Sequence, residues 1–202
     1  MTEKEKMISG ELYDSSDPRL AAEREAAKEL CEKYNATPRA DCAAREKLLR
    51  ELFDSLGENP FVEKNIWVDY GYNIRAGKNF YVNHDSVFLD SARITFGDNV
   101  FIAPQCGFYT AGHPLEREIR SAGLEFAKPI TVGNDVWIGG GVKVMPGVTI
   151  GDNVVIGGGS VVVKDIPSDC VAVGNPARVI KRLRGALSEA KGKAKDGDKT
   201  EI

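Results

Sequence analysis

Residues 130–166 read ITVGNDVWIGGGVKVMPGVTIGDNVVIGGGSVVVKDI, and this stretch decides the fold. A branched apolar residue stands at every sixth position within it: Val132, Ile138, Val144, Ile150, Ile156 and Val162. An α-helix cannot keep such a repeat on one face, because its turn has about 3.6 residues. A hairpin sheet would alternate every second residue and turn at irregular intervals. The spacing therefore predicts a parallel β-solenoid, in which each six-residue unit forms one short strand and one corner.

Three such units close one triangular coil, with the aliphatic side chain pointing inward. The same phase extends back to Phe96 and Ile102, then fails, and resumes at residue 132 without a slip. We therefore expect an excursion loop at about 109–131, and a long polar loop of this kind is a candidate functional segment. Further back, from Val62 to Phe80, the apolar residues recur every sixth place in a different phase.

The chain divides into three parts. Residues 1–58 are charged and alanine-rich, and they predict a small N-terminal segment of two amphipathic helices, the first of which is capped by Asp17 and Pro18. Residues 59–183 form the predicted solenoid. Residues 184–202 alternate Lys, Ala, Gly and Asp without apolar periodicity, which predicts a disordered tail.

Composition excludes several classes of function. The 202 residues carry 27 basic and 30 acidic side chains, so no general attraction to nucleic acid or anionic membrane is expected. The longest apolar run, Val154–Val163, is far shorter than the roughly 20 residues of a membrane helix. The N-terminus does not resemble a secretory signal, and a cytoplasmic location is expected. Four scattered cysteines and two histidines predict no metal site.

The excursion contains His113 and Glu125, which suit a general base and a carboxylate that orients its imidazole. Such loop residues are more often solvated surface, so the alternative stays open. Asn83 can contact a ligand or satisfy a corner, and His84 beside it competes with His113 as the base. We favour His113 because it belongs to the long excursion. Cys106 has no partner of the kind that activates a thiolate, so it is assigned to the core.

Basic residues gather toward the end of the solenoid, among them Lys164, Arg178 and Lys181. Such a cluster suits the phosphates of a long anionic cofactor, and its alternative is a solvated cap that blocks end-to-end stacking. Trp137 either presents a flat contact surface or is a corner residue that packs on a neighbouring subunit.

The six-residue repeat resembles that of the hexapeptide-repeat acyltransferases. More narrowly, the chain from about residue 5 to 183 resembles the maltose and galactoside O-acetyltransferases. The segments that carry this resemblance are 6–13 (KMISGELY), 69–74 (DYGYNI), 79–83 (NFYVN), 112–115 (GHPL), 123–130 (GLEFAKPI), 136–140 (VWIGG) and 174–180 (GNPARVI).

The resemblance implies a mainly β fold with a left-handed parallel β-helix, a homotrimer, acetyl-CoA as the acyl donor and a sugar hydroxyl as the acceptor. The residues it implies for catalysis are His113, Glu125 and Asn83. Those implied for the sugar site are Asp14, Asp69, Tyr81 and Asn83. The candidates for contact with CoA are Asn83, Trp137, Gly140, Gly158, Val163, Lys164, Arg178 and Lys181.

Within this resemblance the maltose branch fits better. The galactoside branch has serine where Asp69 stands and a carboxylate where Ser91 stands. Glucose or maltose is therefore the expected acceptor. Val163 replaces a common threonine, which reduces the expected CoA contact there to the backbone.

The expected mechanism is direct transfer, in which His113 removes the proton from a primary sugar hydroxyl, O6, as that oxygen attacks the thioester. The backbone N–H of Gly140 or the amide of Asn83 is the expected donor to the oxyanion. Two alternatives stay open. One is the same fold with another acceptor, such as a galactoside, an amino sugar, a lipo-oligosaccharide or a small-molecule amine. The other is a non-catalytic solenoid that serves as an assembly or binding module.

Overall fold

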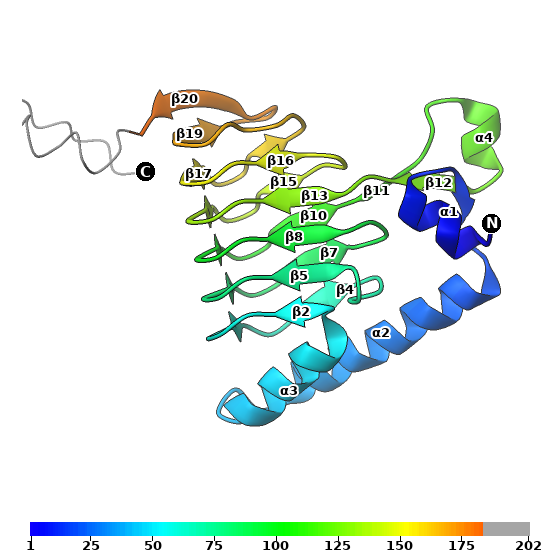
Figure 1. Ribbon diagram of the computed structural model, residues 1–202, viewed down its shortest axis with the longest axis horizontal. Helices are drawn as coiled ribbons and strands as arrows, with labels where there is room; N and C mark the ends of the chain where they lie inside the picture. The colour runs from blue at the N-terminus through cyan, green and yellow to red at the C-terminus, as the bar shows by residue number, and fades with distance from the viewer. Residues whose placement is uncertain (184–202) are drawn as a thin grey trace, which may run out of the picture.

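Stacked strands in three sheets form the walls of a β-helix in the computed structural model, which describes residues 1–183 (Figure 1). The predicted tail, 184–202, lies outside the described residues. The first sheet, called the β10 sheet, comprises β4 (Trp67–Val68), β7 (Val87–Leu89), β10 (Gly107–Tyr109), β15 (Lys143–Val144) and β18 (Val161–Val162). The β13 sheet comprises β2 (Ser55–Leu56), β5 (Ile74–Ala76), β8 (Ile94–Phe96), β13 (Ile130–Val132) and β16 (Thr149–Ile150). The β14 sheet comprises β3 (Phe61–Val62), β6 (Tyr81–Val82), β9 (Phe101–Ile102), β14 (Trp137–Ile138), β17 (Val154–Ile156), β19 (Cys170–Val173) and β20 (Arg178–Arg182).

Inward-pointing aliphatic side chains fill the coil. All six members of the repeat, from Val132 to Val162, are at most 1% exposed. Trp137 points outward one residue before the buried Ile138, and its side chain is 48% exposed. Neighbouring coils pair in parallel, apart from β20, which runs antiparallel to β19. The predicted fold class, a mainly β parallel β-helix, is confirmed.

The length of each coil explains why the repeat changes phase. Phe61 pairs with Tyr81, and Tyr81 pairs with Phe101, so the early coils are 20 residues long. Trp137 pairs with Val155, 18 residues later. Since 20 is not a multiple of six, the phase shifts with every early coil. Phe101 pairs with Trp137 across 36 residues, twice the later coil length, and the phase is therefore kept across the excursion.

Asparagine and aspartate side chains form a ladder along one corner of the coil. Asn79, Asn99 and Asp135 each have a positive φ, between 55° and 57°. Among residues with a side chain, asparagine and aspartate tolerate this left-handed backbone best. The Asn79 amide donates to Asn99 Oδ1 at 2.7 Å, and the Asn99 amide donates to Asp135 Oδ1 at 2.8 Å. The ladder gives hydrogen-bond partners to the polar side chains at these corners.

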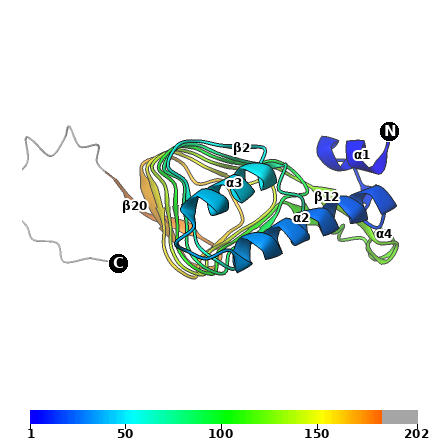
Figure 2. The same ribbon diagram turned by 90° about the horizontal axis from the view of Figure 1, so that it is seen from below.

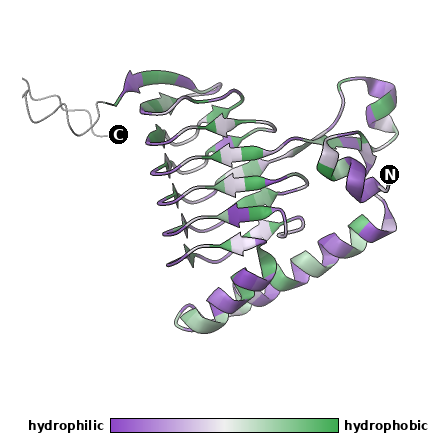
Figure 3. Ribbon diagram, in the orientation of Figure 1, coloured by the Kyte–Doolittle hydropathy of each residue, from purple (hydrophilic) through white to green (hydrophobic). Residues whose placement is uncertain are grey.

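Two of the four helices in residues 1–183, α2 (Pro18–Ala36) and α3 (Cys42–Leu52), close one end of the coil, whereas α1 (Glu3–Ser9) and α4 (Arg117–Ser121) lie at its side, next to β12 (Leu124–Ala127) (Figure 1). Asp17 caps α2 as predicted, accepting from the backbone N–H of Arg19 at 3.0 Å. Seen from below, α3 lies across the end of the coil and α2 runs past it (Figure 2), where Tyr34 and Leu49 join the core. Figure 3 shows hydrophilic (purple) and weakly hydrophobic (pale green) residues along both helices. Within residues 1–183, no helix is long and apolar enough to cross a membrane.

The excursion leaves the coil after β10 and returns at β13. It contains β11 (Ala111–Gly112), α4 and β12 (Leu124–Ala127). β12 pairs antiparallel with β11 on one side and with β1 (Tyr13–Asp14) on the other. The Lys128 N–H donates to the Thr110 carbonyl at 2.9 Å, which joins the two ends of the loop. The excursion and the N-terminal segment therefore share one three-stranded sheet beside the coil.

Replacing Gly71 with alanine is expected to destabilise the fold strongly. Gly71 has φ +76°, and an added Cβ would lie 2.3 Å from the Leu52 carbonyl oxygen. Gly123 is the matched control, because it has φ +80° but nothing within 4 Å of its added Cβ. Both variants carry the cost of a left-handed alanine, so their difference measures the clash, about 1–3 kcal/mol. Thermal unfolding should show a midpoint several degrees lower for Gly71→Ala. Equal midpoints would contradict the assigned packing of α3 on this loop.

Candidate active site

His113 follows β11 directly and presents an exposed ring. Its Nδ1 lies 3.2 Å from the carbonyl oxygen of Leu124, and its Nε2 lies 3.9 Å from Glu125 Oε1. A carbonyl oxygen can only accept, so Nδ1 is the nitrogen that carries the hydrogen. Nε2 then holds the lone pair, and 51% of the side chain is exposed. This geometry is suitable for a general base.

Glu125 lies on β12, where the register of the small sheet pairs it with Tyr13. The Tyr13 hydroxyl donates to Glu125 Oε2 at 2.7 Å. Tyr13 is completely buried, and this burial, with a further contribution from Glu125, raises the pKa of its hydroxyl. The hydroxyl therefore keeps its proton near neutral pH. Tyr13 holds one oxygen of Glu125 while the other faces His113.

Asp69 ends β4 at the same edge of the β10 sheet. Burial raises the pKa of Asp69, Arg24 and Lys28 lower it, and Glu125 raises it. The negative charge of Glu125 therefore acts on Asp69. Its backbone N–H donates to Asp90 Oδ1 at 2.9 Å. Asp90 is completely buried, which raises the pKa of its carboxyl to about 7.

Asp14 was predicted to line the sugar site, but its side chain faces away from Glu125. Its Oδ1 accepts from the Ser16 N–H at 2.9 Å and from the Ser16 hydroxyl at 2.7 Å, and these bonds lower its pKa. Residues next to each other on a strand point to opposite faces, so Asp14 points away from the face on which Tyr13 meets Glu125. Among the described residues, no hydrogen bond or ion pair joins Asp14 with His113. Its role in acceptor binding stays a prediction.

Asn83 and Tyr81 lie at the other edge of the β10 sheet. Asn83 precedes β7, whereas Asp69 follows β4 and the excursion that carries His113 follows β10 of the same parallel sheet. Parallel strands place their starts at one edge and their ends at the opposite edge. Tyr81 stacks on Phe61 along the outer face of the β14 sheet, with ring centroids 5.8 Å apart. A single chain therefore does not bring these two residues together with His113.

Asn83, Gly140 and Gly158 share one corner of the coil, between the β14 and β10 sheets. The Gly140 carbonyl accepts from the Gly159 N–H at 2.8 Å, and a Cβ on Gly158 would lie 3.2 Å from that oxygen. Asn83 Oδ1 accepts from the His84 N–H at 2.8 Å, which leaves the amide nitrogen as the outward donor. This corner is narrow, and it carries backbone and amide donors.

The remaining residues that were predicted to contact CoA lie in three places. Arg178 pairs with Val173 on the terminal β19–β20 ribbon, next to the corner of Gly158, and Lys181 lies three residues further along β20. Val163 and Lys164 follow β18, at the edge where His113 emerges. Trp137 lies on the outer face of the β14 sheet, in register with Phe101 and Val155.

Arg24, Tyr13 and Asp90 are site residues that sequence reasoning missed. Tyr13 lies 112 positions from Glu125. Arg24 lies 46 positions from Tyr70, whose hydroxyl it contacts. No periodicity connects such distant partners, although Tyr13 lies within a segment that carries the family resemblance.

Other chemistry is not supported by the described residues. The Cys106 thiol is buried, which raises its pKa, and its sulfur lies 3.2 Å from the Gly139 carbonyl. Burial outweighs the nearby charge of Lys143, so the thiol lacks the exposure and the lowered pKa of a reactive cysteine, in agreement with its assignment to the core. Residues 1–183 contain no group of three or more His, Cys, Asp or Glu side chains able to hold a metal ion.

Known proteins resemble the chain along most of its length. Two family models match it: the maltose acetyltransferase hexapeptide capping motif at residues 6–57, and the bacterial transferase hexapeptide (six repeats) at residues 129–164. A Saccharomyces cerevisiae protein named a "putative acetyltransferase" is 49% identical over 180 residues, which cover 89% of this chain and 92% of that protein.

Solved structures agree with these matches. A maltose O-acetyltransferase from Clostridium difficile is 53% identical, with a TM-score of 0.90 over 91% of this chain and 98% of its own. A galactoside acetyltransferase in complex with coenzyme A is 41% identical, with a TM-score of 0.89 over 97% of each chain. A hexapeptide-repeat acetyltransferase from Vibrio cholerae, complexed with acetyl-CoA, is 40% identical, with a TM-score of 0.81 over 91% of this chain and all of its own.

These matches define an acetyltransferase with a parallel β-helix. The chain belongs to the hexapeptide-repeat acetyltransferases, in the family of the maltose and galactoside O-acetyltransferases. The resemblance predicted from the sequence is confirmed. Solved relatives that hold coenzyme A or acetyl-CoA support acetyl-CoA as the donor.

Replacing Tyr13 with phenylalanine is expected to lower acetyl transfer about tenfold. The change removes the hydroxyl that holds Glu125 Oε2, so the carboxylate loses its fixed position beside His113. Initial rates with acetyl-CoA measure the effect. Tyr34→Phe is the control, since it deletes the bond from the buried Tyr34 hydroxyl to the Val62 carbonyl, 2.5 Å long, at the end of the coil that the helices close. A Tyr13→Phe rate equal to that of the control would show that Glu125 needs no such support.

Proposed function

We propose that this protein transfers the acetyl group of acetyl-CoA to a primary hydroxyl, O6, of glucose, maltose or a related sugar. The observation that carries the proposal is the geometry of His113, whose Nδ1 is engaged by Leu124 and whose exposed Nε2 lies beside Glu125. The 53% identity with a maltose O-acetyltransferase supports a sugar as the acceptor.

His113 acts as the general base. Its Nε2 takes the proton of the acceptor hydroxyl as the oxygen attacks, and it returns that proton to the departing thiolate. Acetyl-CoA supplies the activated acetyl group, so the chain itself needs no covalent nucleophile. The Glu125 carboxylate, 3.9 Å from Nε2, stabilises the positive charge that forms on the ring. Asp69 accepts hydrogen bonds from the other hydroxyls of the sugar, and Asp14 stays a predicted acceptor ligand.

The glycine corner is the proposed path of the acyl donor. Gly140 and Gly158 carry no side chains that would obstruct a thin, extended ligand. None of the described residues accepts a hydrogen bond from the Gly140 N–H, which leaves it available to the charge that develops on the thioester oxygen. The Asn83 amide is a second such donor. Arg178, Lys181 and Lys164 supply positive charge for phosphates, Trp137 offers a flat contact, and Val163 contributes backbone contact.

A homotrimer completes the proposed site. One chain has Asn83 and Tyr81 at one edge of the β10 sheet and His113 at the other. A heterologous interface joins two different edges of neighbouring copies, and three copies close such an arrangement into a ring. Each site then takes His113, Glu125 and Asp69 from one copy and Asn83 and Tyr81 from the next. The exposed rings of Phe101 and Trp137 offer apolar area for this contact.

Another acceptor on the same scaffold is the second candidate. The carboxylates of Asp69 and Glu125 beside the base would accept hydrogen bonds from an amine as readily as from a hydroxyl. The yeast relative is named only for acetyl transfer, without an acceptor. A galactoside, an amino sugar and a lipo-oligosaccharide are therefore included in the test. A non-catalytic assembly module would not need the arrangement around His113.

Replacing His113 with alanine is expected to lower kcat by about 10²–10⁴-fold, because general-base assistance is lost. Release of free thiol from acetyl-CoA, followed across a panel of glucose, maltose, galactosides, amino sugars and a lipo-oligosaccharide, measures both the loss and the preferred acceptor. His84→Ala is the rival variant, since His84 lies at the opposite edge of the β10 sheet. A large loss of kcat in His84→Ala with little loss in His113→Ala would assign the role of general base to His84 in place of His113. Failure of the wild-type protein to acetylate any sugar would reject the sugar acceptor.

A further inference from the structure

Arg24 joins two segments at the edge of the coil that carries His113. It lies on α2 and is half-buried. Its Nη1 donates to the Tyr70 hydroxyl at 2.7 Å, and its Nη2 donates to the Ser15 carbonyl at 2.7 Å. Ser15 follows β1 of the small sheet, and Tyr70 belongs to the loop that follows β4 of the coil. One guanidinium therefore connects the N-terminal segment with the coil.

The two segments carry residues of the proposed acceptor site. Ser15 comes two positions after Tyr13, the residue that holds Glu125. Tyr70 comes directly after Asp69. Movement of either segment would therefore displace Asp69 or Glu125.

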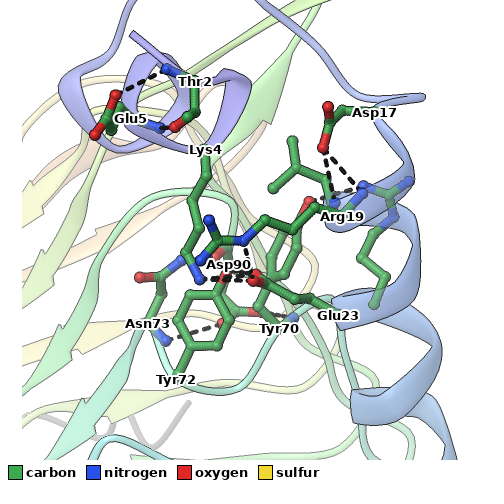
Figure 4. A network of polar contacts seen from close by, with 12 residues as sticks. Thr2, Lys4, Glu5, Asp17, Arg19, Glu23, Tyr70, Tyr72, Asn73 and Asp90 are labelled. Carbon is green, nitrogen blue, oxygen red and sulfur yellow. Dashed lines mark hydrogen bonds and ion pairs between the residues drawn. The ribbon is translucent and has the colours of Figure 1, made fainter.

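Asp90 holds the Asp69 loop from the side of the coil. Its Oδ1 accepts from the backbone N–H of Asp69 at 2.9 Å and of Tyr70 at 2.8 Å. Figure 4 shows Tyr70 and Asp90 within the polar network that also contains Glu23 and Tyr72. The loop is thus attached to the coil through its backbone and to α2 through two side-chain bonds, from Arg24 to the Tyr70 hydroxyl and from the Tyr72 hydroxyl to Glu23 at 2.6 Å. Of these two, the bond from Arg24 is the one directly next to Asp69, and its guanidinium also reaches Ser15.

Arg24 also balances charge in the site. Burial lowers its pKa, while the hydrogen bond to Tyr70 and the charges of Asp69 and Glu125 raise it. The charged groups that act on Asp69 are Arg24 and Lys28 from α2 and Glu125 from β12, and buried Asp90 lies against its backbone. The positive charge of Arg24 offsets the repulsion between the carboxylates of Asp69 and Glu125.

We propose that Arg24 is a positioning residue of the acceptor site, which holds Asp69 through Tyr70 and Glu125 through the Ser15–Tyr13 segment. This inference rests on the proposed function. It assigns to the N-terminal helical segment a part in acceptor binding, in addition to closing the end of the coil. A residue that acts in this way affects the acceptor and leaves the binding of acetyl-CoA unchanged, because the glycine corner lies at the opposite edge of the β10 sheet.

The test compares Arg24→Ala with the wild-type protein in acetyl transfer to the best acceptor of the panel. The KM for the acceptor is expected to rise about ten- to a hundredfold, since displacement of site residues by about 1 Å has effects of this size. The KM for acetyl-CoA should stay constant. The acidic limb of kcat/KM for the acceptor should move to higher pH, because Arg24 lowers the pKa of Asp69 and its removal raises it.

Three further variants separate positioning from general stability. Arg24→Lys retains the charge but lacks the fork that reaches two partners, so the acidic limb should stay in place while the KM for the acceptor still rises. Tyr70→Phe removes one partner of Arg24 and should raise the same KM without the loss of a charge. Arg19→Ala is the matched control: Arg19 lies on the same helix and pairs with Glu23 at 3.1 Å, but it contacts neither Ser15 nor Tyr70. Its kinetics should equal those of the wild-type protein.

An unchanged acceptor KM and pH profile in Arg24→Ala, in a protein that does acetylate sugars, would overturn this inference and leave the proposed function standing. An equal rise of both KM values with a lower melting temperature would also overturn it, because that result indicates a merely structural role. A wild-type protein that acetylates no member of the panel would remove the proposed function and this inference together.

Discussion

The burial of one aliphatic side chain per six residues is the constraint on which the rest of the structure depends. Val132, Ile138 and Val144 turn inward on three successive sheets, and each lies against the equivalent residue of the next coil. Burying a Val or Ile side chain contributes about 1.5–3 kcal/mol, and the parallel backbone bonds hold the coils in register. Because the interior is fixed in this way, every corner recurs at the same edge. Residues far apart in sequence then share one corner, as Asn83, Gly140 and Gly158 do.

A second, weaker interaction brings the excursion to its place. The strands β1, β12 and β11 contribute only a few residue pairs, and they attach the His113 loop to the N-terminal segment. A sheet of this size is marginal by itself. Completely buried side chains, among them Tyr13, Met7 and Leu20, support it as a satellite core. The helices therefore do more than close the coil: their packing determines where Glu125 lies.

The sequence predicted the coil well because its signal is periodic and local. A six-residue repeat can be read from one stretch of chain, and a break in the repeat locates the excursion. The early coils were harder to assign, because a coil of 20 residues shifts the phase. The site was predicted only in part. His113 and Glu125 could be chosen because they lie in the excursion, whereas the bonds from Tyr13 to Glu125 and from Arg24 to Tyr70 depend on tertiary packing, which leaves no periodic signal.

The division of site residues between two edges has a physical cause in the coil itself. Strands of two or three residues are too short to carry several functional side chains, and their inward positions are occupied by the core. Functional groups must therefore lie at corners or in loops inserted there. Each corner faces one direction only. A site that binds both an acyl donor and an acceptor therefore needs residues from two edges of the coil. The proposed contact between copies would bring the two edges together without any change in the coil.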